Sequence, residues 1–552
     1  MSNERKRFSK LVNNPVMEDY SLRYAPSSFR KWSPWMVLLS GIGGIAAMAS
    51  YATGGTIAVE FGFQNAFWAV IVSSLLIFLT GLPIAYQVAK NNIDMDLLTR
   101  AAGFGYFGST LTSLIYASFT FIYFALEGAI MAQCINDYFH IPFAVSYLIS
   151  GIVIIPLVLY GMTALSKFQA WSQPVWLGLV IVAIVGVFIH DPHAIHSWTQ
   201  FTGKAGTSAF SMPLFASACG ILLSLLAQIG EQADYLRFMP DMKPNQRFSW
   251  WFALIMSGPG WVIIGAFQTL LGTFLASYVA LHFGFQDATV PIAMFDYAFQ
   301  TTLHNPELVL TIASILVLLS QLKINVTNAY SGSLSWSNLF SRILHSHPGR
   351  VVWLLFQVAV GILIMEMGIF DSLTAILGFY SNVAVAWIGA VVSDIVINKG
   401  ILKVSPPQIE FKRAHLYNFN PVGFGSMVIA SVVSIVVYFG AFGENLKSYS
   451  SFLSLAIALV LPPIIAILTK GKYYIARTSG EELKEIMQSS PTKDEVSCIV
   501  CGHSYELHDI AYCPFHQGAI CSLCCSLDSS CHDACKESTN VDVQDDLLRE
   551  TV

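Results

Sequence analysis

Several polar side chains interrupt an apolar run near residue 320, LVLLSQLKINVTNAYSG, that is otherwise typical of a membrane span. At helical spacing, Gln321, Asn325 and Asn328 share one face, whereas Ser320 and Lys323 lie on roughly the opposite face. Amides offer a donor and an acceptor together, which suits the edge of a nucleobase. A charge inside hydrocarbon usually faces a bundle interior, so Lys323 is predicted to be functional. The alternative for the amides is that they only cross-link helices.

A second polar stripe follows the segment STLTSLIYASFTFIYFALEGAIMAQCIND. Tyr116, Thr120, Tyr123, Glu127 and Cys134 align on one face of a helix. An aromatic ring one turn before a carboxylate suits a planar ligand, because the ring stacks and the carboxylate accepts hydrogen bonds. Since intramembrane carboxylates are costly, Glu127 is predicted to bind this ligand. The alternative is a protonated Glu127 bonded to a neighbouring helix, beside tyrosines that only pack.

Membrane helices must position these stripes. The chain has 552 residues, of which 55% are hydrophobic and 11% are charged, against about 25% charged in ordinary soluble domains. A bilayer core requires about 20 apolar residues per helix, and we predict twelve spans. They cover residues 34–59, 66–89, 110–134, 141–162, 171–190, 209–229, 250–281, 308–328, 351–370, 374–397, 422–442 and 452–469.

Basic residues predict the orientation of the chain. Lys and Arg concentrate before the first span and in alternate connections, such as YLRFMPDMKPNQR and NKGILKVSPPQIEFKR. Connections between these, such as EFGFQN and NDYFHI, carry none. By the positive-inside rule, both termini are expected in the cytoplasm. The N-terminal segment has no apolar h-region, so we expect no cleavable signal and an integral protein of the plasma (inner) membrane.

Composition divides the chain into five parts. We expect a cytoplasmic segment over residues 1–32, a membrane domain over 33–477, a linker over 478–497, a cysteine-rich domain over 498–536 and an acidic tail over 537–552. Glycine clusters occur in the first span, SGIGGIAAMASYATGGT, and in the sixth, ASACGILLSLLAQIGEQADYLRF. Two such spans five apart favour the discontinuous helices of an inverted-repeat transporter. The alternative is close helix packing through small residues.

Four segments carry a family resemblance: EDYSLRYAPSSFRKWSPW, FALEGAIMAQ, ADYLRFMPD and NVTNAYSGSLSWSNLFSR. Residues 15–475 resemble the purine–cytosine permeases of nucleobase–cation symporter family one. The resemblance implies an all-α integral membrane protein with the LeuT-type fold. In that fold two inverted five-helix repeats, here about 33–190 and 207–397, are followed by two peripheral helices. A small zinc-binding domain would complete this chain.

The resemblance also implies a substrate at the midplane between helices one, three, six and eight. The implied substrate-binding residues are Tyr123, Glu127, Ser224, Gln228, Asn325 and Asn328. Tyr123 falls where relatives often have tryptophan, and Asn328 takes the role of Asn325 if the register slips. Leu225 replaces the second stacking aromatic of sodium-coupled hydantoin carriers, so a complete aromatic sandwich is not expected.

A second departure from the family concerns the cation. The sodium site of LeuT-type carriers would use carbonyls near Gly44–Met48 and hydroxyls at positions 319 and 320, but only Ser320 is a hydroxyl. Lys323 is therefore predicted to take the place of sodium, with its ammonium donating to carbonyls of the first-span break. No sodium is predicted. The alternative is that Lys323 extends to the interface or pairs with Glu231 or Asp234.

The cysteine-rich domain is predicted to bind zinc. It holds eight of the ten cysteines, and its ligand spacings suit tetrahedral zinc. The four predicted ligand pairs are Cys498 and Cys501, Cys513 and His516, Cys521 and Cys524, and Cys531 and Cys535. Four pairs fit two structural zinc ions, in an order that resembles a RING cross-brace. Cytoplasmic thiols stay reduced, which favours metal over disulfides, and a redox or iron–sulfur centre is the alternative. His503, His508, His532 and Cys525 are competing ligands.

Together with the family resemblance, which implies a purine, pyrimidine, hydantoin or allantoin-type substrate, these patterns predict a proton-coupled, sodium-independent secondary transporter. No nucleophile elbow, phosphate loop or zincin motif is present, so no enzyme is expected, and no nucleic-acid partner. The alternative function is a nucleobase sensor. The cysteine-rich segment resembles one that follows permease-like modules in some sensor histidine kinases, and it would signal to a separate cytoplasmic partner.

Overall fold

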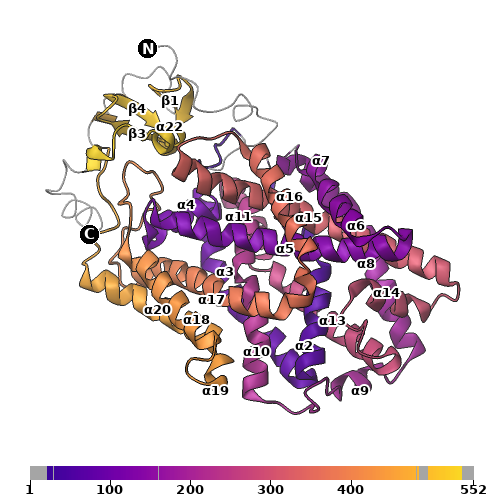
Figure 1. The fold of residues 1–552 in the computed structure, drawn as a ribbon. Helices are drawn as coiled ribbons and strands as arrows, with labels where there is room; N and C mark the ends of the chain where they lie inside the picture. Colours follow the sequence, from indigo (N-terminus) through magenta and orange to yellow (C-terminus); the bar gives the residue numbers. More distant parts are fainter. Residues whose placement is uncertain are drawn as a thin grey trace.

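The computed structural model describes residues 22–28, 30, 32–159, 161–479, 482–483, 486 and 495–536. The predicted acidic tail, most of the linker and most of the N-terminal segment lie outside the described residues. Apolar helices dominate the rest, and the cysteine-rich domain lies at one end of the helical body (Figure 1). By length and composition, nine helices within the described residues can cross a membrane, or ten if one bent pair counts as a span. The chain is therefore a multi-pass membrane protein.

All twelve predicted apolar stretches fold as helices, but two fall short of a membrane-spanning helix by length. One is the pair α6 (Phe143–Ile152) and α7 (Ile154–Leu159), and the other is α16 (Arg350–Glu366). Twelve crossings are thus not established. The long helices are α3 (Phe63–Asn91), α5 (Gly108–Phe139), α8 (Gly161–His190), α13 (Trp261–Phe283), α15 (Pro306–Leu344), α17 (Leu373–Val392), α18 (Ser426–Tyr438) and α20 (Ser450–Leu468). Shorter helices are α4 (Met95–Thr99), α9 (Ala194–Thr199), α12 (Arg247–Ser257), α14 (Pro291–Gln300) and α19 (Glu444–Lys447).

The first predicted span is broken. It folds as α1 (Pro34–Gly43) and α2 (Met48–Phe61), which are bent by 49° across residues 44–47. Broken helices leave backbone N–H and C=O groups at the break without helical partners. This confirms the prediction of a discontinuous helix at the first glycine cluster.

The close-packing alternative is also correct, at a different glycine of the same span. A Cβ added at Gly54 of α2 would lie 2.1 Å from the carbonyl oxygen of Thr269 on α13. On α13, a Cβ at Gly272 would lie 2.4 Å from the carbonyl oxygen of Tyr51. The backbones of α2 and α13 therefore touch through these two glycines, which holds α2 in place beside the break.

The sixth predicted span is not unwound. It runs from α10 (Met212–Leu222) through a 3₁₀ segment, Leu223–Gln228, into α11 (Ile229–Leu236). A stretch of 3₁₀ inside a helix commonly marks a functional site. The third and eighth spans, α5 and α15, pack against each other over a long interface, so the two polar stripes predicted from the sequence meet.

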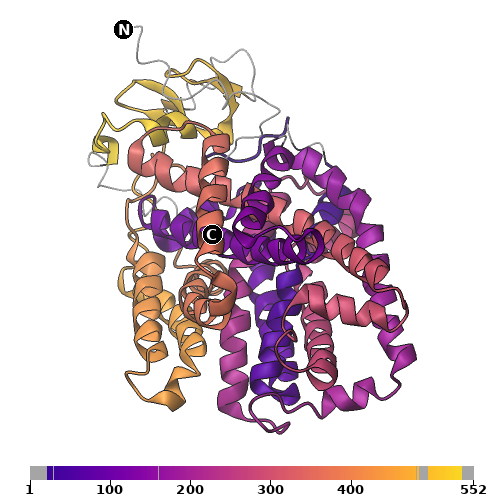
Figure 2. The same cartoon turned by 45° about the vertical axis from the view of Figure 1, so that its right-hand side comes forward.

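The cysteine-rich domain contains two short hairpins and one helix. Strand β1 (Glu495–Ser497) pairs antiparallel with β2 (Ser504–Glu506), and β3 (Ile510–Cys513) pairs antiparallel with β4 (Gly518–Cys521). Helix α22 (Ser522–Leu527) follows β4 directly and packs against α15. Both views place this domain on one end of the membrane unit (Figure 2).

Candidate functional site

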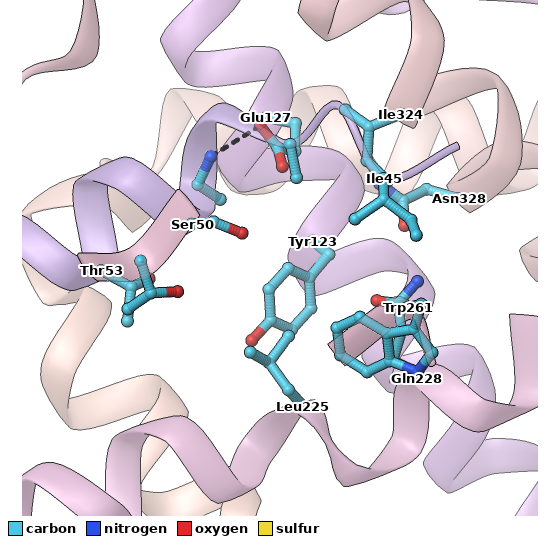
Figure 3. Close-up of a pocket in the computed structure, with 13 residues that line it drawn as sticks. Ile45, Ser50, Thr53, Tyr123, Glu127, Leu225, Gln228, Trp261, Ile324 and Asn328 are labelled. Carbon is cyan, nitrogen blue, oxygen red and sulfur yellow. Dashed lines mark hydrogen bonds between the residues drawn. The ribbon is translucent and has the colours of Figure 1, made fainter. Parts of the chain in front are cut away.

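A small central cavity lies at the break of the first span. Its lining comes from the break, α2, α5, the 3₁₀ segment, α13 and α15 (Figure 3). The lining residues are Ile45, Ala47, Ala49, Ser50, Thr53, Tyr123, Glu127, Leu225, Gln228, Trp261, Thr269, Ile324 and Asn328. Four predicted substrate residues, Tyr123, Glu127, Gln228 and Asn328, are therefore brought together from three different helical segments.

Glu127 joins the cavity wall to the broken helix. Its Oε2 accepts a hydrogen bond from the Ala49 backbone N–H at 3.0 Å, and its side chain is only 1% exposed. Ala49 lies in the first turn of α2, where N–H groups lack helical partners and the helix dipole favours negative charge. Glu127 thus caps α2 and also presents a carboxylate to the cavity.

Two aromatic rings border the cavity. Tyr123 lies near its centre in Figure 3, and its hydroxyl bonds to Ser224 Oγ at 3.0 Å. Trp261, at the first position of α13, supplies the second ring. Leu225 also lines the cavity, whereas Trp261 was not among the predicted residues. The local signal was Gly-Pro-Gly before it, residues 258–260, which starts a helix next to the site.

Unpaired polar atoms mark the cavity as a polar binding site. Within the described part of the chain, neither Trp261 Nε1 nor Asn328 Oδ1 has a hydrogen-bond partner. Asn328 is 1% exposed and Trp261 is 5% exposed. A buried donor or acceptor without a partner costs about 1–3 kcal/mol, so these atoms favour a ligand that offers one acceptor and one donor.

Two predicted residues lie outside the cavity lining. Asn325 donates from Nδ2 to the Phe124 carbonyl at 3.3 Å, and its Oδ1 accepts from Asn328 Nδ2 at 3.1 Å. The expectation that Asn325 lines the cavity is therefore corrected to Asn328, one helical turn later. Ser224 lies behind the cavity and orients the hydroxyl of Tyr123.

Lys323 does not contact the break of the first span, which corrects its predicted geometry. Its Nζ donates to the Gln169 carbonyl at 3.0 Å and to Ser172 Oγ at 2.9 Å, both on α8. The side chain is fully buried, and among the described residues no carboxylate lies within ion-pair distance. The alternative pairing with Glu231 or Asp234 is therefore absent too. Lys323 ties α15 to α8.

The carbonyls at the break bind donors of the protein itself. Gln268 Nε2 donates to the Ile45 carbonyl at 2.8 Å, and the Ser320 hydroxyl donates to the Ala46 carbonyl. Trp176 Nε1 donates to Ser320 Oγ at 3.0 Å. Ser320 therefore supplies a hydroxyl at the position predicted for the sodium site. This hydroxyl, however, donates its proton to the Ala46 carbonyl.

One set of predicted metal ligands comes together in the cysteine-rich domain. The sulfur atoms of Cys498, Cys501, Cys521 and Cys524 all lie within 4.8 Å of one another. Cys521 N–H and Cys524 N–H point at Cys498 Sγ and Cys521 Sγ, each at 3.4 Å. Four thiols on two short turns can hold a tetrahedral metal ion. The first and third predicted pairs form this cluster, in cross-brace order.

The second predicted ligand set does not form as predicted. Cys513, Cys531 and Cys535 line one small cavity together with Cys525, whereas His516 is not part of that lining. His516 Nε2 instead bonds to Asp528 Oδ2 at 2.6 Å. Within the described residues, the first cluster is the only group of three or more cysteine, histidine or carboxylate ligand atoms that all lie within 4.8 Å of one another.

Solved structures with the same arrangement of helices are secondary transporters. The chain aligns with Mhp1, a nucleobase-cation-symport-1 family transporter in a closed conformation with bromovinylhydantoin bound, at a TM-score of 0.61 and 14% identity. That alignment covers 83% of this chain and 99% of Mhp1. A Na⁺-coupled sialic acid symporter aligns at a TM-score of 0.51 and 16% identity, over 81% of this chain and 94% of that chain. The fold is thus a transporter fold, as the resemblance implied.

Residues 24–460 match the family model of permeases for cytosine/purines, uracil, thiamine and allantoin. The chain belongs to this family, which confirms the resemblance. The cytosine permease of Escherichia coli K12 is 24% identical over 202 residues, 35% of this chain. The cytosine permease of strain O157:H7 matches to the same extent. The chain matches only 45% of the length of these relatives.

Proposed function

We propose that this protein is a secondary transporter of a nucleobase-like heterocycle, bound in the central cavity. The observation that carries this proposal is that Trp261 Nε1 and Asn328 Oδ1 have no hydrogen-bond partner within the described residues. Both residues line the same cavity as the Tyr123 ring and the Glu127 carboxylate. A flat ligand can stack on an aromatic face while its edge forms hydrogen bonds. Family membership supports the same class of substrate.

The polar atoms of Glu127, Asn328 and Trp261 determine which hydrogen-bond donors and acceptors the edge of the substrate must offer. Glu127 and Asn328 Oδ1 accept hydrogen bonds, so the ligand offers at least two N–H donors. Trp261 Nε1 only donates, so the ligand also offers a carbonyl oxygen or an unprotonated ring nitrogen. Purines, pyrimidines, hydantoins and allantoin all carry such groups, whereas an apolar ring leaves the buried atoms unpaired.

Transport is proposed to be independent of sodium and coupled to protons through Lys323. The break carbonyls of Ile45 and Ala46 already accept bonds from Gln268 and Ser320, which removes ligands that a sodium ion would need. Lys323 supplies a positive charge between α15 and α8, and loss of its proton would weaken the tie between these helices. This proposal departs from the Na⁺-coupled symporter that shares the fold.

The cysteine-rich domain is proposed to hold structural zinc at Cys498, Cys501, Cys521 and Cys524. Four thiolates with short spacings favour zinc or an iron–sulfur cluster. A domain of about 40 residues is too small for an adequate core, so we expect it to require metal for folding. Both termini are proposed to be cytoplasmic, where the thiols remain reduced.

Uptake of labelled nucleobases into proteoliposomes tests the carrier. The ligand is first chosen by a thermal-shift screen of purines, pyrimidines, hydantoins and allantoin on the purified protein. We expect uptake that is unchanged when sodium is replaced by choline and that increases with an imposed proton gradient. Steep sodium dependence contradicts the coupling proposal. Binding without uptake contradicts the carrier and favours the sensor.

A further inference from the structure

Four cysteines of the C-terminal domain remain outside the first cluster, and they line one cavity. Cys513 ends β3, Cys525 lies in α22, and Cys531 and Cys535 follow that helix. None of them is in a disulfide. Four thiols from three segments that line one cavity have the composition of a structural metal site.

We propose that Cys513, Cys525, Cys531 and Cys535 form a second four-thiolate zinc site, with Cys525 in the place of His516. The proposal rests on the zinc binding proposed for the domain and assigns a ligand set that differs from the one predicted from sequence spacing.

Two adjacent cysteines of α22, Cys524 and Cys525, can belong to two different metal sites. Successive residues of a helix point about 100° apart, so Cys524 and Cys525 face different sides of α22. Cys524 joins the first cluster. Cys525 instead lines the second cavity with Cys513, Cys531 and Cys535.

His516 is not part of the lining of this cavity, although Asp528, its hydrogen-bond partner, is. It lies three residues after Cys513, but its Nε2 bonds to Asp528 at 2.6 Å, and its side chain is 29% exposed. A carboxylate can orient a histidine that binds metal through its other nitrogen. The measurement must therefore distinguish sulfur from nitrogen as the fourth ligand.

Cationic groups surround the proposed site and suit its charge. A zinc ion with four thiolates has a net charge of about −2. Arg413 donates from Nη1 to the Cys525 carbonyl at 2.7 Å and forms an ion pair with Asp533 at 3.0 Å. Lys536 pairs with Asp533 at 3.3 Å. Groups of this kind fix the backbone of ligands and balance their charge.

The site lies at the joint between the domain and the membrane unit. Asn418 donates to Asp533 at 3.0 Å, and Lys536 donates to Asn418 Oδ1 at 3.0 Å. Arg413 and Asn418 both belong to the membrane unit. A metal in this site would therefore order the surface through which the domain docks.

Two measurements on the full-length protein test the assignment: the metal content, and X-ray absorption spectroscopy at the zinc edge. The protein, purified under reducing conditions, should contain about two zinc ions per chain, each with about four sulfur ligands near 2.3 Å and no nitrogen shell near 2.0 Å. Cys525→Ser should lower the content to about one, whereas His516→Ala should retain two.

The outcomes separate this inference from the proposal on which it rests. Absence of zinc contradicts metal binding by the whole domain. A single zinc with four sulfur ligands leaves the first site in place and overturns the second. Two zinc ions with a nitrogen ligand, or loss of one ion in His516→Ala but not in Cys525→Ser, assigns His516 instead. Because the absorption spectrum is measured on the unmodified protein, a variant that fails to fold does not decide the result.

Discussion

At the scale of single residues, Glu127 has two roles that one substitution can separate. Its carboxylate caps the N-terminus of α2 through Ala49 and also faces the cavity. Glutamine retains an oxygen that can accept the Ala49 hydrogen bond, but it has no charge. Alanine removes both. The two variants therefore report on different parts of the site.

We predict that Glu127→Ala lowers ligand affinity at least tenfold, because a charge-assisted hydrogen bond of about 1.5–3 kcal/mol is lost. Glu127→Gln should lose less affinity and should keep the thermal stability of the unliganded protein. Titration calorimetry and thermal unfolding measure the two effects. Glu307→Gln, at the exposed start of α15, is the matched control. Undiminished affinity in a folded Glu127→Ala protein would contradict the assignment.

For Lys323, we predict that substitution by glutamine flattens the dependence of uptake on pH. The Nζ bonds to Gln169 and Ser172 can persist with an amide, but the group no longer gains or loses a proton. Uptake between pH 5 and pH 8 measures the effect, with the exposed Lys447→Gln as control. An unchanged pH profile in Lys323→Gln assigns the coupling to another group.

At the scale of helices, the contact between α2 and α13 holds half of the broken span. Gly54 leaves no room for a side chain, since its Cβ position lies 2.1 Å from a backbone oxygen of α13. A backbone atom cannot rotate away as a side chain can. The two helices must therefore separate if the glycine is replaced.

We predict that Gly54→Ala destabilises the protein by about 1–3 kcal/mol, the usual cost of overpacking. Gly178→Ala on α8 is the control, because no atom lies within 4 Å of its Cβ position. Alanine favours a helix over glycine by about 1 kcal/mol, so this control should be neutral or stabilising. Thermal unfolding in detergent measures both. Equal midpoints for the two variants would show that α2 and α13 can move apart without cost.

At the scale of the whole molecule, the cysteine-rich domain holds the segment that leads into α1. Leu22 is buried in the core of that domain, and Arg23 pairs with the buried Asp509 at 2.6 Å. The Arg23 guanidinium also lies 4.2 Å from the centre of the Tyr505 ring, whose hydroxyl contacts Cys501 Sγ at 3.3 Å. The cluster of Cys498, Cys501, Cys521 and Cys524 is thus linked to the segment that leads into the broken helix.

We predict that Arg23→Gln loosens this link and speeds amide hydrogen exchange in residues 504–509 at least several-fold. Removing one partner of a buried pair leaves a charge uncompensated, which costs about 3–5 kcal/mol. Exchange measured by mass spectrometry should not change in Lys204→Gln, which breaks an exposed pair with Glu60. Removal of zinc by a chelator should speed exchange in the same residues. Unchanged exchange after both treatments would mean that domain and segment are ordered independently.

Much of this site could be predicted from periodicity and from the family resemblance. Tyr123 and Glu127 were found because a carboxylate inside an apolar helix is costly and a 3.6-residue period shows its face. Trp261 was not predicted, because only the Gly-Pro-Gly segment before it distinguishes it from other aromatic residues of apolar spans. Asn325 and Asn328 share a face, so periodicity could not decide which of them reaches the cavity.

The sequence by itself determined the membrane class, the family, the break of the first span and the cross-brace pairing of four cysteines, because each depends on local composition and spacing. Only the tertiary structure decided the partners of Lys323, the lining of the second cavity by Cys525 and not His516, and the contact of residues 22–23 with the C-terminal domain. These features depend on which helices and strands lie side by side and on how each side chain turns. The spacing of residues along the sequence gives neither piece of information, because it does not say which residues hundreds of positions apart lie side by side after the chain folds.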